Sequence, residues 1–257
     1  MMKIQYVLLD PTGNRTILVE TPVKASEQPS VAAKLMECEP SAEQVGFIRI
    51  DGERAAMRMA GGEFCGNAAM SAAALVAELR GIRKGLIPVS VIGTPEPVTV
   101  QITKNADSWQ GTVQMPRPVR IGTETFPDGR AFPVVRFDGI CHVITDPSLS
   151  REEAERLAPE WCAFLKAEAV GILLFDRAGG TLTPLVYVPM ARTLCWENSC
   201  ASGTTAIGAY LAACEGNAAL SLRQPGGTLR IETDPEGRLL LTGRVRRVYR
   251  KSVEIAE

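Results

Sequence analysis

The chain has 257 residues, of which 46% are apolar, so it can fill one large core or the cores of two ordinary domains. Its 28 basic and 29 acidic residues are mixed along the chain and only 5% of residues are aromatic, which argues against a nucleic acid or an anionic membrane as partner and favours a small-molecule ligand. No apolar run approaches the ~20 residues that span a bilayer, and the N-terminus enters a strand pattern without a signal peptide, so a cytoplasmic protein is expected.

The first 115 residues are predicted to form short strands and two helices. A Pro-Thr-Gly-Asn turn between the first two strands predicts a β-hairpin with Asn14 at its tip. Residues 30–38 have helical spacing behind Ser30 as the expected N-cap, and Glu43 stands at the entrance of the strand that follows. A turn is expected at residues 93–95. The strands predicted in this half cover residues 3–10, 15–21, 44–50, 55–60, 86–92, 98–103 and 112–115.

The motif Pro116-Arg117-Pro118 is the predicted domain boundary, because two prolines that flank one residue favour an extended connector. After it the order of elements repeats, with a helix over residues 151–165 and a second Ala-rich helix behind Cys200. This repetition is the pattern that a tandem duplication would produce. The strands expected in the second half cover residues 132–137, 139–144, 170–175, 183–187, 220–223, 228–233, 239–243 and 246–253.

Two segments far apart in the chain share a cysteine followed by small residues and then an apolar, Ala-rich run. They are residues 63–71, Glu-Phe-Cys-Gly-Asn-Ala-Ala-Met-Ser, and residues 197–205, Glu-Asn-Ser-Cys-Ala-Ser-Gly-Thr-Thr. The runs at 68–79 and 204–213 predict two closely packed helices, each headed by a cysteine. Because a helix N-terminus presents unpaired N–H groups and the positive end of the dipole, we expect both thiols to have a pKa below the usual value of about 8.5 and to be partly thiolate near neutral pH.

The duplicated cysteines, Cys65 and Cys200, suggest two opposed bases around one substrate atom. The N–H groups at the start of the two helices are suited to holding a carboxylate. An acid held by its carboxylate, with a sulfur on each face of its α-carbon, has the geometry of a cofactor-independent racemase. The N–H groups in question belong to Gly66, Asn67, Ala201 and Ser202.

The other cysteines show no such context. The seven cysteines form an odd set without a CxxC pair or zinc-ligand spacing, which argues against structural zinc and against an obligate disulfide framework. We therefore predict no metal site and interpret the remaining five as small core residues. These are Cys38, Cys141, Cys162, Cys195 and Cys214.

Five segments, in this order, resemble the diaminopimelate epimerase superfamily and, more closely, its branch of histidine racemases that supply D-histidine for staphylopine-type metallophores. The resemblance spans most of the chain. The segments are Pro11-Thr12-Gly13-Asn14 with Thr16-Ile17-Leu18-Val19, Glu43-Gln44-Val45-Gly46-Phe47-Ile48, Glu63-Phe64-Cys65-Gly66-Asn67, Trp196-Glu197-Asn198-Ser199-Cys200 and Gln224-Pro225-Gly226-Gly227.

The resemblance implies an α+β fold of two pseudo-symmetric lobes, each a mixed or antiparallel sheet wrapped around a central helix. The first lobe comprises residues 1–115 and a returning C-terminal strand at 245–257, and the second comprises residues 116–244. The resemblance also implies a homodimer and a racemase or epimerase, an isomerase that needs no cofactor and in particular no pyridoxal phosphate.

Carried over position by position, the resemblance makes Cys65 and Cys200 the two acid–base groups and brings Glu43 and Glu197 into the site. It makes Asn14, Asn67 and the helix-start amides of Gly66, Ala201 and Ser202 substrate contacts. The two glutamates are suited to binding the substrate ammonium, orienting a thiol or contacting an imidazole, and the sequence does not choose among these roles.

Two other functions stay open at this stage. The first is diaminopimelate epimerase or another amino-acid epimerase of the same superfamily, which is disfavoured because residues 59–64 and 192–197 replace the segments with which diaminopimelate epimerase recognises the far end of its substrate. A redox or binding protein with a Cys65–Cys200 disulfide is the second. His142, the single histidine, either lines the site, as a histidine does in diaminopimelate epimerase, or is a hydrogen-bonded core residue. The segment 224–227 is either a site wall or a plain turn.

Overall fold

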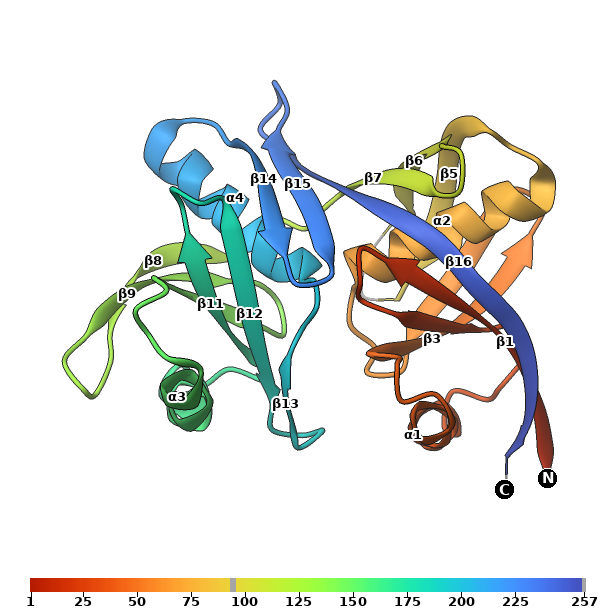
Figure 1. The fold of residues 1–257 in the computed structure, drawn as a ribbon, viewed down its shortest axis with the longest axis horizontal. Helices are drawn as coiled ribbons and strands as arrows, with labels where there is room; N and C mark the ends of the chain where they lie inside the picture. The colour runs from red at the N-terminus through yellow and green to blue at the C-terminus, as the bar shows by residue number, and fades with distance from the viewer. Residues whose placement is uncertain (93–95, 256–257) are drawn as a thin grey trace. The chain divides into compact units, whose positions relative to one another are not determined.

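The structure is a computed structural model that describes residues 1–92 and 96–255. These residues form sixteen strands and four helices, so the protein is mostly β (Figure 1). The chain divides into two compact units, and each is described by itself. Unit 1 comprises Met1–Gln114 and the C-terminal segment from Thr242, and unit 2 comprises Met115–Leu241. The turn predicted at residues 93–95 and the last two residues of the predicted strand 245–257 lie outside the described residues.

Unit 1 alternates antiparallel hairpins with parallel pairs bridged by helices. Strands β1 and β2, β3 and β4, and β5 and β6 pair antiparallel, whereas β2 with β3 and β4 with β5 pair parallel across α1 and α2. Strand β7 continues antiparallel from β6, and β16 runs antiparallel along β1, so the chain ends beside its start (Figure 1). The elements are β1 (Met2–Pro11), β2 (Thr16–Val19), α1 (Gln28–Cys38), β3 (Gln44–Asp51), β4 (Arg54–Met59), α2 (Gly66–Arg80), β5 (Lys84–Val91), β6 (Val98–Lys104), β7 (Trp109–Gln114) and β16 (Leu239–Ile255).

Helix α2 is the centre of unit 1. Every residue from Gly66 to Ala77 is buried, and the helix contacts all seven strands from β1 to β7. Its alanines let the strands approach the helix axis on all sides, which is why this helix has no polar face. The helix ends at Gly81, whose left-handed φ of 67° allows its N–H to bond the carbonyls of the last turn.

Unit 2 repeats the same alternation of pairings. Strands β9 and β10, β11 and β12, and β14 and β15 pair antiparallel, whereas β10 with β11 and β12 with β14 pair parallel across α3 and α4. Strands β8 and β13 add to β9 and β12. The elements are β8 (Arg120–Thr125), β9 (Ala131–Arg136), β10 (Cys141–Thr145), α3 (Arg151–Phe164), β11 (Val170–Asp176), β12 (Thr181–Val188), β13 (Thr193–Trp196), α4 (Ala201–Glu215), β14 (Ala219–Gln224) and β15 (Gly227–Thr233).

Helices α3 and α4 of unit 2 pack against different strands. Helix α4 is buried over most of its length and packs on β15 so closely that a Cβ on Gly208 would overlap Ile231. Helix α3 is capped by the Ser150 hydroxyl, which accepts from the N–H of Glu153. Its apolar side lies on β11 and β12, where the fully buried Trp161 ring contacts Phe126 with 4.3 Å between ring centroids.

Three local predictions were wrong. Helix α1 begins at Gln28 with Glu27 as its N-cap, and Ser30 lies inside its first turn, because Pro29 already has the φ that the first turn requires. Strands β8 and β13 were not predicted, since each pairs with a single neighbour and carries few buried side chains. The two strands predicted at 239–243 and 246–253 are one continuous strand, β16.

Candidate active site

A cysteine is the N-cap residue of α2 and of α4, as predicted. Cys65 precedes α2 with φ −131° and ψ 115°, and its Sγ accepts from the N–H of Ala68 at 3.5 Å. Cys200 precedes α4 with φ −115° and ψ 109°, and its Sγ accepts from the N–H of Gly203 at 3.3 Å. The two sulfurs therefore occupy the same local environment, in which a thiol replaces the hydroxyl or carboxylate of an ordinary N-cap.

The residues predicted to hold a carboxylate occupy the first two positions of these helices. Gly66 and Asn67 open α2, and Ala201 and Ser202 open α4. The backbone N–H groups at these positions have no acceptor four residues earlier within the helix, which is why helix N-termini attract anions.

In unit 1, Cys65 is joined to Asn14 and Glu43 through Gln44. The thiol donates to Gln44 Oε1 at 3.3 Å, and Gln44 Nε2 donates to Asn14 Oδ1 at 2.6 Å and to Thr16 Oγ1 at 2.8 Å. Asn14 Nδ2 donates to Glu43 Oε2 at 2.7 Å. The structure thus brings together three predicted site residues and adds Gln44 and Thr16, which the sequence analysis did not select.

This network has one orientation, and Glu43 sets it. A carboxylate only accepts hydrogen bonds, so Asn14 must turn its NH₂ group toward Glu43 and its oxygen toward Gln44. Gln44 must then turn its NH₂ group toward Asn14, which leaves its oxygen facing the Cys65 sulfur. In this orientation Gln44 Oε1 accepts the hydrogen bond of the Cys65 thiol.

We predict that Glu43→Gln lowers the turnover of this site by about tenfold, because a neutral amide both donates and accepts and so no longer sets the orientation of Asn14 and Gln44. The measurement is the rate of the racemisation expected from the sequence, followed against pH. Glu39→Gln is the matched control, because Glu39 lies in the same unit and bonds Tyr249 and Ser41 instead of the Cys65 network. An unchanged rate and pH profile for Glu43→Gln would remove this role.

Cys200 lies in a more buried environment than Cys65, which is only partly buried. Burial raises the pKa of the Cys200 thiol well above its ordinary value, the nearby Glu197 carboxylate raises it further, and hydrogen bonds from Ser202 and Gly203 lower it. The prediction of a partly ionised thiol near neutral pH is therefore wrong for Cys200. The loss of hydration raises the pKa of the Cys200 thiol by more than the helix N-terminus lowers it.

Hydrogen bonds through Gln224 and Thr204 hold both the N–H and the carbonyl of Cys200. Gln224 Oε1 accepts from the N–H of Cys200 at 2.8 Å, and its Nε2 donates to Thr204 Oγ1 at 2.8 Å. The Thr204 hydroxyl in turn donates to the carbonyl of Cys200 at 2.7 Å. Residues 225–226 form the predicted turn, while the buried Gln224 fixes the position of the cysteine.

His142, for which the sequence left two interpretations open, lies on β10 with no exposed surface. Its Nε2 is 3.0 Å from the Ser202 hydroxyl, which is itself 3.4 Å from the Cys200 sulfur. The histidine is thus buried and also connected to the proposed base of its own unit.

Comparison with known proteins assigns this arrangement to a family. Residues 3–248 match the family model described as "Histidine racemase CntK N-terminal domain". The chain belongs to this histidine racemase family.

Individual relatives agree with that assignment. A histidine racemase of Staphylococcus aureus is 33% identical over 89% of this chain and 88% of its own length, and one of Fusobacterium nucleatum is 30% identical over 90% of both chains. Among solved structures, a predicted epimerase from Pseudomonas aeruginosa superposes with a TM-score of 0.75 at 16% identity, covering 98% of this chain and 100% of that one, which shows a shared fold.

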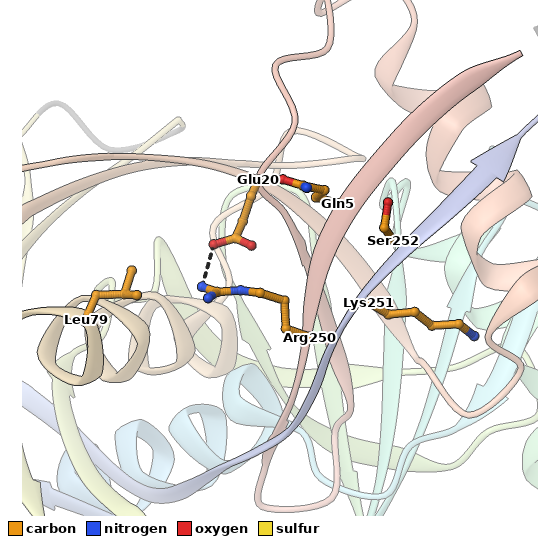
Figure 2. Close-up of a pocket in the computed structure, with 6 residues that line it drawn as sticks. All are labelled: Gln5, Glu20, Leu79, Arg250, Lys251 and Ser252. Carbon is orange, nitrogen blue, oxygen red and sulfur yellow. Dashed lines mark hydrogen bonds and ion pairs between the residues drawn. The ribbon is translucent and has the colours of Figure 1, made fainter.

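The structure also bears on disulfides, metal sites, membrane-spanning helices and surface hollows. Among the described residues no disulfide forms, and no cluster of three or more potential metal ligands occurs. The prediction of core cysteines is confirmed for Cys141 and Cys162, which are buried, and wrong for Cys38, Cys195 and Cys214, which are exposed. No helix in the described part of the chain has the length and apolarity to cross a bilayer. A surface hollow of unit 1 is lined by Gln5, Glu20, Leu79, Arg250, Lys251 and Ser252 (Figure 2). Two of its charged residues pair with each other, since Arg250 donates to Glu20 at 2.8 Å.

Proposed function

We propose that the chain is a histidine racemase that interconverts L- and D-histidine without a cofactor, with Cys65 and Cys200 as its two bases. The observation that carries this proposal is the pair of buried helices headed by cysteines with the same capping geometry, in a chain of the histidine racemase family. The relatives whose printed name is histidine racemase support the substrate.

We further propose that the two units are duplicated lobes, each a sheet around a central helix. The shared order of pairings supports this: antiparallel, parallel, antiparallel, parallel, antiparallel, with a helix at each parallel step. The cysteine follows the fourth strand of that order in both units, after β4 in unit 1 and after β12 with its added strand β13 in unit 2.

In the proposed reaction, the substrate carboxylate is bound by the helix-start amides of Gly66, Asn67, Ala201 and Ser202, with Asn14 as a further contact. One sulfur begins as thiolate and takes the α-proton, while the other begins as thiol and gives its proton to the opposite face. The negative charge passes from the first sulfur to the second, so atoms and charge balance. The two helix N-termini stabilise the charge that builds on the carboxylate as the C–H bond breaks.

The two glutamates have different proposed roles. Glu43 orients Asn14 and, through it, Gln44, whose oxygen accepts from Cys65 when that sulfur is a thiol. Glu197 stands beside Cys200 and opposes its ionisation. Either carboxylate is also suited to binding the substrate ammonium.

A homodimer and a cytoplasmic location are part of the proposal by resemblance to the superfamily and by the sequence features described above. Light scattering on the purified protein measures the first. A monomer at micromolar concentration would contradict the proposed dimer and leave the proposed reaction unaffected.

The deciding experiment is a panel of L-amino acids, including histidine and diaminopimelate, followed by loss of optical rotation and by α-hydrogen exchange in heavy water without added pyridoxal phosphate. Histidine is expected to racemise and exchange. Turnover of diaminopimelate alone would contradict the assignment of histidine as substrate and leave the two-base mechanism standing. Absence of any exchange, together with a thiol-dependent change in stability, would replace the racemase by a redox or binding protein.

A further inference from the structure

A continuous hydrogen-bonded path joins a buried histidine to one proposed base. His142 on β10 contacts Ser202 on α4 through Nε2 and Oγ at 3.0 Å, and the same Oγ is 3.4 Å from Cys200 Sγ. All three residues belong to unit 2. The path is therefore internal to one compact unit, where β10 and α4 pack on each other.

The imidazole is held in place by its neighbours on the sheet. Gly171 is the register partner of His142 on the adjacent strand β11, and a Cβ at position 171 would overlap Nδ1 of the ring. Phe137 presents its ring at 6.1 Å between centroids and 76° between planes. A side chain at position 171 would therefore displace the ring.

The imidazole is neutral in the folded protein. Burial lowers the pKa of His142 from 6.5 to about 3, and no carboxylate opposes this effect at the ring itself. The other groups near the path are Glu197 and Cys200, which lie beyond Ser202. At neutral pH, His142 is therefore an uncharged imidazole with a proton on one of its two ring nitrogens.

The surroundings of Nδ1 select the tautomer. Nδ1 is buried without a hydrogen-bond partner among the described residues, whereas Nε2 faces the Ser202 hydroxyl. A buried N–H donor without an acceptor is rarer in proteins than a buried acceptor without a donor. The proton is therefore expected on Nε2, where it has an acceptor, and the lone pair on Nδ1.

We propose that His142 is a positioning residue for Cys200: its Nε2–H donates to Ser202 Oγ, which turns the Ser202 hydroxyl proton toward the Cys200 sulfur. The effect on catalysis rests on the proposed racemase function, while the tautomer does not. When the Cys200 thiol gives its proton to the substrate carbon, the resulting thiolate is buried and receives two fixed donors, the Ser202 O–H and the Gly203 N–H. No proton moves along the path.

The tautomer can be observed directly, because His142 is the only histidine of the chain. In untagged protein labelled with ¹⁵N-histidine, two-bond ¹H–¹⁵N correlation spectra should show Nε2 protonated and Nδ1 unprotonated, unchanged from pH 5 to pH 9. Protonation on Nδ1 would overturn the proposal, because Nε2 would then accept the Ser202 proton and take it away from Cys200. Ordinary titration near pH 6.5 would overturn it as well.

Paired variants test the link to Cys200. Ser202→Ala should lower kcat about tenfold and move one limb of the pH profile to higher pH, with little change in KM, because the backbone amide that meets the substrate is kept. Ser202→Thr keeps the hydroxyl and should restore most of the rate. His142→Gln, which places a donor at the Nε2 position, should resemble the parent, and His142→Leu should resemble Ser202→Ala.

A parental rate and pH profile in Ser202→Ala would overturn the catalytic role even with the expected tautomer. If the chain racemises no amino acid, the proposed function fails while the spectra still report on the hydrogen-bond path. If histidine racemises but Nδ1 carries the proton, the inference fails and the function stands.

Discussion

Replacing Cys65 or Cys200 by alanine should lower the racemisation of histidine by about 10²–10⁴-fold, the range that general acid–base groups contribute. Each sulfur is expected to serve one face of the α-carbon, so neither can replace the other. The measurement is the initial rate from each enantiomer by optical rotation. Cys38→Ala and Cys214→Ala are matched controls, because both thiols are exposed and outside the two networks. Parental rates in either active-site variant would end the two-base mechanism.

The single variants should also separate exchange from inversion. With one sulfur left, α-hydrogen exchange in heavy water should persist for one enantiomer only, with retention of configuration, and the preferred enantiomer should be opposite in Cys65→Ala and Cys200→Ala. Equal exchange of both enantiomers in both variants would show that a different group removes the proton.

Acid should destabilise the protein through His142. Its pKa is about 3 in the folded protein against 6.5 for the exposed group, so between these values the unfolded chain binds a proton that the folded chain does not. Stability from this residue is therefore fully present above pH 6.5 and is lost as the pH falls toward 3, at about 1.4 kcal/mol per pH unit. Between pH 7 and pH 4 the loss is on the order of 3 kcal/mol.

Urea unfolding of the parent and of His142→Gln at a series of pH values isolates this effect, since both chains share every carboxylate. The free energy of unfolding of the parent should fall more steeply with acid than that of the variant, and the two slopes should agree above pH 7. Parallel curves over the whole range would show that the histidine is not kept neutral by burial.

The local features of both cysteine helices could be predicted because they depend on neighbours in the chain. An Ala-rich run behind Cys-Gly-Asn or Cys-Ala-Ser predicts a buried helix with the cysteine at its start, and both helices begin as expected. The hairpin at Asn14 and the strand after Glu43 were likewise predicted from turn residues and β-branched runs. The N-cap of α1 was missed by three residues, since Pro29 and Ser30 both suit a helix N-terminus and only Pro29 takes part in setting it.

Gln44, Thr16 and Gln224 were not selected from the sequence, although Gln44 adjoins Glu43 and Gln224 lies in a quoted motif. Their roles arise from hydrogen bonds across strands and helices, as in the contact of Gln224 with the Cys200 backbone 24 positions earlier. A glutamine in a strand carries no local sign of its partner. The motif resemblance could have directed attention to both glutamines, because each is part of a matched segment.

The order of amino acids determined which residues place thiols at helix N-termini and which family the chain belongs to, because capping and motif spacing are local properties. The protonation of those residues followed only from the folded units. Burial reverses the expected effect of the helix dipole on Cys200, and burial beside Gly171 keeps His142 neutral and directed at Ser202. Hydration is lost only when distant segments pack together, so no stretch of sequence contains that information.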